Sequence, residues 1–244
     1  MSTEPHVRVL GSKQELSTAA AELFVDVGSR AIAQTGRFVI ALSGGSTPRG
    51  MNQELAANFS SRLDWEKVFF FWSDERHVPP DHPDSNFKMA NETLLSKLPV
   101  PADHIFRTPA ELQDAGQAAA AYEAALQSFF CLPAGSFPRF DLILLGMGPD
   151  GHTASLFPGT TALEETQHLV VANWVEKFST FRITFTYPVL NNAATVAFLV
   201  SGSDKAETIN KVFKDPAANL PCQKVQPHDG NVIWLLDKEA AEGL

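Results

Sequence analysis

The sequence RFVIALSGGSTPRG occupies residues 37–50 and decides the fold. Residues 37–42 are almost all apolar, which is typical of a strand buried on both faces of a parallel sheet. Two glycines and two hydroxyl side chains follow, and then a helical stretch. We expect Thr47 to cap this helix and Pro48 to lie in its first turn, where a missing N–H is tolerated. A strand that passes through a glycine-rich turn into a helix is the repeating unit of α/β proteins.

The same alternation extends along the chain. A capping box formed by Ser12 and Glu15 predicts a helix from there to about residue 35. Near-continuous apolar strands separated by helices predict a parallel sheet covered on both faces. Helices are scarce between residues 168 and 200, so antiparallel pairing stays open there. We expect one domain over residues 1–244, with strands at 7–10, 37–42, 68–72, 140–145, 169–172, 182–186, 195–200 and 232–236, and further helices at 86–97, 113–130, 205–214 and from 237.

The composition is that of a globular protein, with 44% hydrophobic and 19% charged residues. A net charge of −9 disfavours nucleic acid and anionic membranes as partners, but not a small anionic substrate. No stretch approaches the ~20 apolar residues of a membrane span, and no targeting segment is recognisable, so we expect a cytoplasmic protein. The two cysteines, Cys131 and Cys222, have no metal-binding or disulfide spacing and are expected to be reduced.

Four loops rich in glycine and charge follow predicted strands, at 43–47, 73–77, 146–152 and 202–205. Ligands of open α/β sheets bind at the carboxyl ends of the strands, so one edge of the sheet could hold all four loops. The first loop suits a phosphate because its glycines allow close approach and a helix N-terminus follows. A tight turn without a ligand is the alternative. The loop is not a Walker motif, and its residues are Ser43, Gly44, Gly45, Ser46 and Thr47.

The second and fourth loops carry charged residues. Arg76 could hold a phosphate with its planar guanidinium, and Asp74 could accept hydrogen bonds from sugar hydroxyls. Lys205 is a candidate second cation for the phosphate. The alternative for each is an ordinary solvated charge. Glu75 and His77 receive no predicted function.

The third loop, GMGPDG at 146–151, matches the dinucleotide fingerprint G-x-G-x-x-G. Its context argues against a nucleotide, because Pro158 would shorten the following helix and no acidic residue ends a strand about twenty residues on. We instead predict that His152 transfers protons, with Asp150 as a neighbour that orients it or only shapes the turn. Ser155 does not lie in a G-x-S-x-G elbow, so a serine nucleophile is not expected.

Seven motifs, in order, resemble the 6-phosphogluconolactonase family, which is similar to glucosamine-6-phosphate deaminases and ribose-5-phosphate isomerases. The resemblance covers nearly the whole chain. It implies a modified Rossmann-like three-layer α/β sandwich with a mostly parallel sheet, without nucleotide, cofactor or required metal. The motifs are SGGSTP (43–48), SDERHVP (73–79), HPDSN (82–86), LGMGPDGHTASLFPG (145–159), RITFTYPVLNNA (182–193), GSDKAE (202–207) and QPHDG (226–230).

The resemblance also implies an activity, the hydrolysis of 6-phospho-D-glucono-1,5-lactone to 6-phospho-D-gluconate in the oxidative pentose phosphate pathway. His152 falls at the position of the general base. The loop at 44–46, Arg76 and Lys205 fall at phosphate-binding positions, and Arg182 is a further candidate. We expect the glycine-rich turns, with Gly148 and Gly151, to contact the substrate and supply backbone N–H groups to an oxyanion.

Two other functions stay open. Amino-sugar phosphate isomerases and deaminases resemble the chain at Asp150-Gly151-His152, but carry a glutamate five residues after the histidine, where this chain has Phe157. They also read D-E-Y where this chain has D-E-R. A non-catalytic sugar-phosphate sensor would normally carry a DNA-binding or partner-binding extension, and the first predicted strand starts almost at once. The expected partner is therefore a small sugar phosphate lactone, with no nucleic acid, membrane or obligate protein partner.

Overall fold

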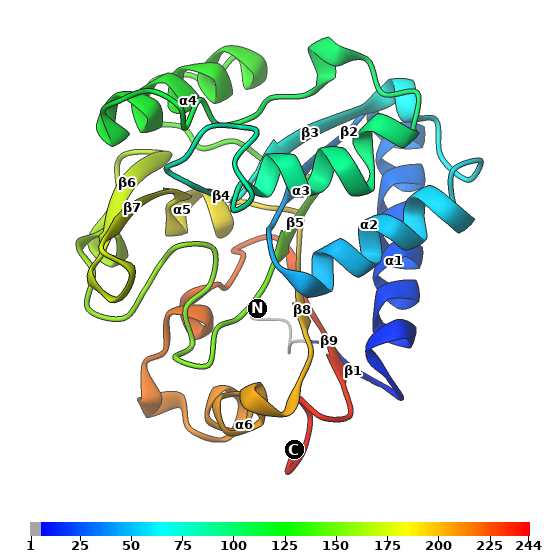
Figure 1. Cartoon of the computed structure of the whole chain (residues 1–244), viewed down its shortest axis with the longest axis vertical. Coiled ribbons are helices and arrows are strands. Elements are labelled where there is room, and N and C mark those ends of the chain that lie inside the picture. The colour runs from blue at the N-terminus through cyan, green and yellow to red at the C-terminus, as the bar shows by residue number, and fades with distance from the viewer. Residues whose placement is uncertain (1–5) are drawn as a thin grey trace.

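A six-stranded parallel sheet forms the centre of the computed structural model, which describes residues 6–244 (Figure 1). The strand order is β1-β9-β8-β5-β2-β3, and every neighbouring pair is parallel. All six strands therefore end at the same edge of the sheet. They are β1 (His6–Leu10), β2 (Phe38–Leu42), β3 (Val68–Trp72), β5 (Leu142–Leu145), β8 (Thr195–Val200) and β9 (Asn231–Asp237).

A second, antiparallel sheet lies beside the first, in the order β4-β7-β6. It consists of β4 (Asp74–Arg76), β7 (Thr180–Phe185) and β6 (Val170–Val175). The possible antiparallel pairing after residue 168 is therefore confirmed for β6 and β7, whereas β8 joins the parallel sheet. The strand β4 was not predicted, because its three polar residues have no strand pattern and pair only through contacts with β7.

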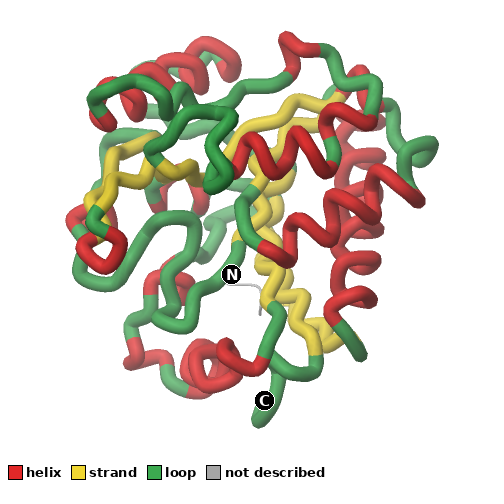
Figure 2. Tube along the Cα trace, viewed as in Figure 1, coloured by secondary structure: helices red, strands yellow, loops and turns green. Residues whose placement is uncertain are grey.

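The helices form the outer layers, with α1, α2 and α3 on one face of the parallel sheet and α4 with the small sheet on the other (Figures 1 and 2). Alternate residues of β2 enter the two cores, with Ile40 beneath α1 and Ala41 on the opposite side. The predicted three-layer α/β sandwich is confirmed. The helices are α1 (Lys13–Thr35), α2 (Ser46–Asn58), α3 (Asn86–Thr93), α4 (Ala115–Phe130), α5 (Tyr187–Leu190) and α6 (Ala206–Lys214).

Two predicted helix starts differ in detail. The Ser12 hydroxyl accepts the N–H of Glu15 at 3.2 Å, as predicted, but the Glu15 carboxylate accepts the N–H of Gly11 at 3.0 Å instead of closing the box on Ser12. The prediction that Thr47 caps α2 is wrong. Gly45 is the N-cap, so Thr47 lies inside the first turn.

The predicted terminal helix from residue 237 is also wrong. Strand β9 extends to Asp237, and the following residues form turns. The Asp237 carboxylate accepts the N–H of Ala240 at 2.8 Å and the N–H of Gly202 at 3.1 Å. This carboxylate therefore stops the strand and ties its end to the neighbouring loop.

The two cysteines lie in different surroundings, Cys131 exposed and Cys222 buried. Cys131 and Cys222 are both free thiols, and burial raises the pKa of Cys222 to about 12. Within residues 6–244, no helix combines the length and the apolar character needed to cross a membrane.

The edge strand β3 is closed at its carboxyl end by Tyr122 of α4. The Tyr122 hydroxyl accepts the N–H of Trp72 at 2.7 Å and donates to the Trp72 carbonyl at 3.1 Å. Both groups are buried and would otherwise lack a hydrogen bond on this side of the strand. One phenol thus satisfies two backbone groups directly before the loop that carries Asp74 and Arg76.

We expect Tyr122→Phe to lower the free energy of unfolding by about 1–3 kcal/mol, because it leaves two buried backbone groups unpaired. Chemical denaturation of the variant and the unmodified protein measures this difference. Tyr187→Phe is the matched comparison, since its hydroxyl makes a single bond, to the Pro221 carbonyl at 3.0 Å. Equal stability of Tyr122→Phe and the unmodified protein would contradict the assignment.

Candidate active site

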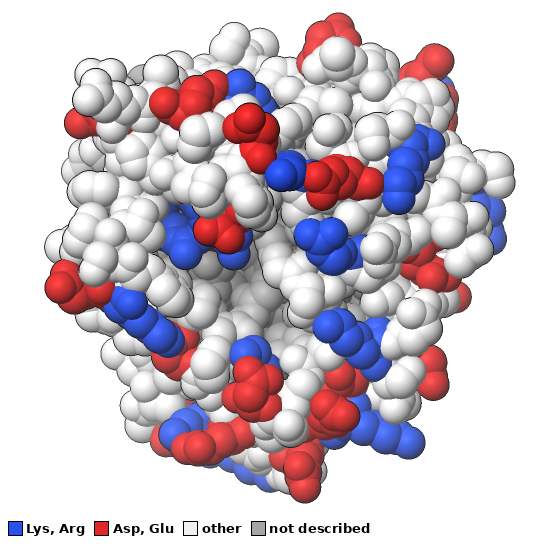
Figure 3. All heavy atoms as spheres, viewed as in Figure 1, with Lys and Arg blue, Asp and Glu red and all other residues white. Residues whose placement is uncertain are grey.

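A cavity of about 400 Å³ lies at the carboxyl ends of the parallel strands and is lined by all four predicted loops. Figure 3 shows the hollow on this face, with Lys and Arg side chains and acidic side chains around it. The expectation that the loops meet at one edge is confirmed. The predicted residues on the cavity wall are Ser43, Gly44, Gly45, Ser46, Thr47, Asp74, Arg76, Gly148, His152 and Lys205.

The first loop offers backbone N–H groups to the cavity. Gly45 adopts φ 106°, and no side chain of residues 6–244 caps α2. The N–H groups of the first turn are therefore available, and the helix dipole adds positive potential. Gly44 packs so tightly on Asn86 that a Cβ would lie 1.8 Å from its Oδ1, which only glycine permits. These features are typical of a phosphate site.

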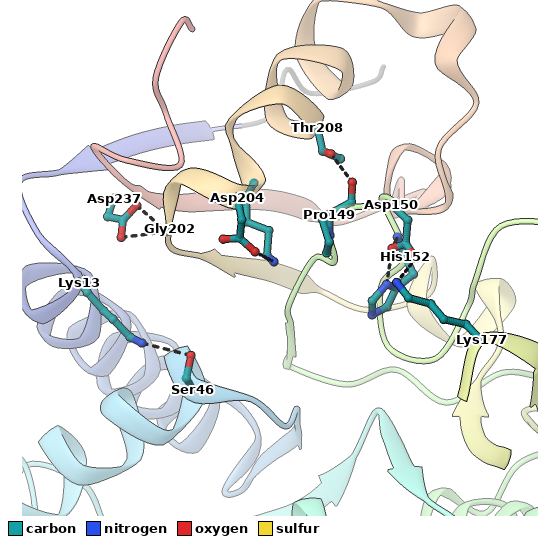
Figure 4. A network of polar contacts seen from close by, with 11 residues as sticks. Lys13, Ser46, Pro149, Asp150, His152, Lys177, Gly202, Asp204, Thr208 and Asp237 are labelled. Carbon is teal, nitrogen blue, oxygen red and sulfur yellow. Dashed lines mark hydrogen bonds and ion pairs between the residues drawn. The ribbon is translucent and has the colours of Figure 1, made fainter. Parts of the chain in front are cut away.

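The cation Lys13, at the start of α1, also reaches this loop. Its Nζ donates to the Ser46 hydroxyl at 3.1 Å (Figure 4). Lys13 is not among the residues that line the cavity. It holds a cavity-lining hydroxyl from outside and adds positive charge near the phosphate loop.

Asp74 presents a largely buried carboxylate at the cavity wall. Its Oδ2 accepts the Ser155 hydroxyl at 2.7 Å, and the Asn86 amide donates to its Oδ1 at 3.4 Å and to its carbonyl at 2.9 Å. These bonds fix the carboxylate as a hydrogen-bond acceptor. The Ser155 hydroxyl is thereby held against the Asp74 carboxylate.

Glu75, for which no function was predicted, organises the second loop. Its buried carboxylate accepts the N–H groups of Arg76, Asn86 and Phe87 at 2.7–2.8 Å, and the Ser85 hydroxyl at 3.1 Å. Burial raises the pKa of Glu75, and the three backbone donors oppose that shift. The carboxylate therefore holds β4 against the start of α3. A glutamate next to Asp74 in a motif is difficult to distinguish by sequence from a solvated charge.

Two arginines face each other across the small sheet. Arg76 of β4 lies on the cavity wall and is opposite Arg182 of β7. The Arg76 Nη1 donates to the Asp84 carbonyl, which directs the guanidinium. Burial and the charge of Arg76 lower the pKa of Arg182, whose Nε has no hydrogen-bond partner among residues 6–244. Arg182 is not on the cavity wall, so it adds positive charge from behind Arg76.

His152 and Asp150 form a hydrogen-bonded pair at the third loop, with the His152 Nδ1 and the Asp150 Oδ1 2.5 Å apart (Figure 4). The imidazole is on the cavity wall, and Asp150 lies behind it. Burial opposes ionisation of Asp150, but the hydrogen bond and charge of His152 lower its pKa. Because Nδ1 is bonded to the carboxylate, Nε2 is the ring nitrogen left for the cavity. Asp150 therefore orients the imidazole as well as shaping the turn.

Close packing holds the imidazole from two sides. A Cβ on Gly148 would lie 2.0 Å from the His152 Nδ1, so this position must be glycine. The Phe157 ring stacks on the imidazole with centroids 4.0 Å apart and planes 19° apart. The left-handed φ of 46° at Ala154, a non-glycine residue, bends the chain between these two rings. Phe157 therefore covers one face of the imidazole.

The fourth loop brings Lys205 to the cavity. Its Nζ pairs with Asp204 Oδ2 at 2.5 Å, and both side chains line the wall. Asp237 fixes this loop, because its carboxylate accepts the Gly202 N–H (Figure 4). The same carboxylate also accepts the Ser201 hydroxyl. An aspartate at the end of a predicted strand is the feature by which Asp237 could have been found.

One further predicted residue, Gly151, and several residues without a predicted function remain. Gly151 is not on the wall: its φ is 76°, and a Cβ would lie 2.9 Å from Leu220, so it shapes the turn. His77 bonds to the Leu112 carbonyl, away from the cavity. Among residues 6–244, no three His, Cys, Asp or Glu side chains cluster in a way that could hold a metal ion. Wall residues that the sequence did not single out are Asn86, Met147, Ala154, Ser201 and Asp204.

Known proteins resemble this chain along nearly its full length. The model of the family described as glucosamine-6-phosphate isomerases/6-phosphogluconolactonase matches residues 11–234. Proteins named 6-phosphogluconolactonase from Nostoc sp. and Synechocystis sp. are each 43% identical, with 98% of both chains covered. The solved structure of the Trypanosoma brucei 6-phosphogluconolactonase has a TM-score of 0.89 and 32% identity, with 100% of both chains covered.

A monomeric glucosamine-6-phosphate deaminase of known structure has a TM-score of 0.80 at 22% identity, with 97% of this chain and 98% of that chain covered, which shows a shared fold. The family match, the full-length relatives and the geometry of the cavity agree with one another. The chain belongs to the glucosamine-6-phosphate isomerase/6-phosphogluconolactonase family.

Proposed function

We propose that this protein hydrolyses 6-phospho-D-glucono-1,5-lactone to 6-phospho-D-gluconate, as a cytoplasmic enzyme of the oxidative pentose phosphate pathway. One observation carries the proposal: His152, which is bonded to Asp150, lines the same cavity as the first loop, Arg76 and Lys205. The relatives named 6-phosphogluconolactonase support the same substrate. The substrate is a small molecule, and the reaction as proposed needs no cofactor or metal.

The phosphate end of the substrate would occupy the first loop. The N–H groups at the start of α2, the Arg76 guanidinium and the Lys205 ammonium converge there from three separate loops. Arg182 raises the positive potential behind Arg76. Asp204 competes for Lys205 until the phosphate, with its greater charge, replaces it. Holding the phosphate fixes the distance to the lactone carbonyl, which lowers the entropic cost of reaction.

The other end of the substrate would lie at His152. Neutral His152 accepts a proton from water at Nε2 while the water oxygen bonds to C1 of the lactone. The tetrahedral oxyanion is stabilised by backbone N–H groups of the glycine-rich turns, each worth about 3 kcal/mol in enzymes where this was tested. The bond between C1 and the ring oxygen then breaks, and the imidazolium returns its proton to that oxygen. Asp74 accepts hydrogen bonds from the sugar hydroxyls.

The structure disfavours deamination of an amino sugar phosphate. Opening a pyranose ring requires an acid or base at the ring oxygen, and the corresponding position holds Phe157, stacked on the imidazole. A phenyl ring cannot transfer a proton. Lactone hydrolysis needs no second group of this kind, because the carbonyl is already electrophilic.

The function is tested with freshly prepared 6-phosphogluconolactone and with glucosamine 6-phosphate, after subtraction of spontaneous hydrolysis. We expect turnover of the lactone alone. His152→Ala should lower kcat by about 10²–10⁴-fold, the range for loss of a general base, with a KM within a few-fold of normal. His168→Ala is the matched control, because that exposed histidine pairs with Glu165 and lies outside the cavity. Near-normal turnover by His152→Ala would remove His152 from its proposed role.

Asp150→Asn tests the pair. The acid limb of a kcat/KM profile reports protonation of the essential base of the free enzyme. In the variant, the imidazolium loses its anionic partner, so protonation requires a lower pH. The acid limb of kcat/KM should therefore shift to lower pH. The new amide can turn its NH2 group toward Nδ1 and favour the other imidazole tautomer, so kcat should fall by roughly 10- to 1,000-fold. The lowered pKa of Asp150 predicts that the carboxylate itself does not titrate within this limb. An unchanged acid limb would contradict the pairing.

Arg76→Ala tests the phosphate site. Loss of one charge-assisted contact should raise KM by about 10- to 150-fold. Arg76→Lys should recover part of the loss, because it keeps the charge without the planar fork. Arg107→Ala is the matched control, since Arg107 pairs with Glu111 outside the cavity. A normal KM for Arg76→Ala would reject the phosphate contact.

A further inference from the structure

The connection between β6 and β7 reaches the catalytic pair from outside the cavity. This connection contains a short 3-10 helix, Glu176–Phe178, and none of its residues lines the cavity. Two consecutive side chains, Lys177 and Phe178, nevertheless contact the residues that hold His152. The proposed function assigns nothing to this segment.

Phe178 supports the imidazole through Phe157. The two phenyl rings meet edge to face, with centroids 5.9 Å apart and planes 77° apart. The buried Phe157 ring in turn stacks on the imidazole. Phe178 itself is 47% exposed. The three rings, Phe178, Phe157 and His152, therefore form a row of contacts that runs from the solvent to the imidazole. An edge-to-face contact limits movement of the middle ring and therefore of the imidazole plane.

Lys177 supports the carboxylate. Its Nζ lies 3.7 Å from Asp150 Oδ2, while Asp150 Oδ1 is bonded to the imidazole (Figure 4). The two oxygens thus have different partners, one from the third loop and one from the β6–β7 connection. Rotation of the carboxylate would break both contacts.

We propose that the β6–β7 connection is a positioning element for the catalytic pair, in which Phe178 holds the plane of His152 through Phe157 and Lys177 holds the carboxylate of Asp150. This inference rests on the proposed role of His152 as the base. Neither side chain touches the substrate site, so both act on the rate of the chemical step and not on binding.

Other charged groups also surround the pair. Asp74 and Arg76 of β4 and Lys205 of the fourth loop share the cavity with His152, and the thiol of Cys222 lies on the Asp150 side. Arg182 and Lys177 both lie near the Phe178 ring, at 5.4 and 5.6 Å. Of these groups, Lys177 alone forms an ion pair with Asp150 within residues 6–244. Removal of the Lys177 ammonium should therefore leave the imidazole as the only cationic partner of the Asp150 carboxylate among these groups.

The aromatic contact is tested with Phe178→Ala and Phe178→Leu. We expect Phe178→Ala to lower kcat about 5- to 50-fold with an unchanged KM, and Phe178→Leu to restore part of the rate by refilling the contact. Phe181→Ala is the matched control, because this phenylalanine is exposed on the same hairpin but packs on Trp174. Its kcat should be normal. An equal loss in Phe178→Ala and Phe181→Ala would reduce the effect to general weakening of the hairpin and overturn the proposal.

The charged contact is tested with Lys177→Met and Lys177→Arg. In Lys177→Met the Asp150 carboxylate has no lysine partner and therefore stabilises the imidazolium more strongly. The acid limb of kcat/KM should shift to higher pH by a few tenths of a pH unit, on the order expected for a partly screened charge. The shift should shrink at high salt and be absent in Lys177→Arg. Lys67→Met, which removes an exposed pair with Asp64 far from the cavity, should leave the limb unchanged.

His152→Ala, measured alongside, separates the two proposals. If it keeps near-normal turnover, the general-base role fails and the positioning role fails with it. If it is inactive while Lys177→Met and Phe178→Ala match the unmodified protein in kcat and acid limb, the positioning role alone is overturned.

Discussion

Parallel hydrogen bonding of six strands is the constraint on which the site depends. In a parallel sheet every strand ends at the same edge, so loops separated by more than a hundred residues meet there. The phosphate loop after β2, the imidazole loop after β5 and the lysine loop after β8 line one cavity for this reason. Buried cores pack on both faces of the sheet, so the relative positions of these loops are set by the buried strands.

The small antiparallel sheet contributes one acidic and one basic side chain to the cavity. Strand β4 leaves the end of β3 and pairs with β7, which brings Asp74 and Arg76 over the cavity. This placement sets two arginines opposite each other and buries the Glu75 carboxylate, both of which are unfavourable in isolation. Three backbone N–H donors offset the cost of burying the Glu75 carboxylate. An anionic substrate would offset the repulsion between Arg76 and Arg182. The charges of the free protein therefore favour binding of the phosphorylated ligand that we propose.

The proposed catalytic pair, Asp150 and His152, depends on close packing as much as on hydrogen bonding. Glycine at position 148 lets the imidazole lie against the backbone, and Phe157 covers its other side. The Asp150 carboxylate is hydrogen-bonded to the Nδ1 atom of the ring. Together these contacts limit both the plane and the tautomer of the ring. The β6–β7 connection extends this support to the surface.

By itself, the sequence determined the alternation of strands and helices, the buried parallel strands and the four loops that carry the site, because hydrophobic periodicity and glycine placement are local properties. The ordered motifs also predicted roles for His152, Arg76, Lys205 and the loop at 43–47, and all four line the cavity. Only the tertiary structure decided that β4 is a strand, that Glu75 and Asp237 fix loops, that Gly45 and not Thr47 caps α2, and that Arg182 lies behind Arg76. These features arise from contacts between segments far apart in the chain, and no local pattern encodes which backbone N–H a carboxylate will meet or which ring will cover an imidazole.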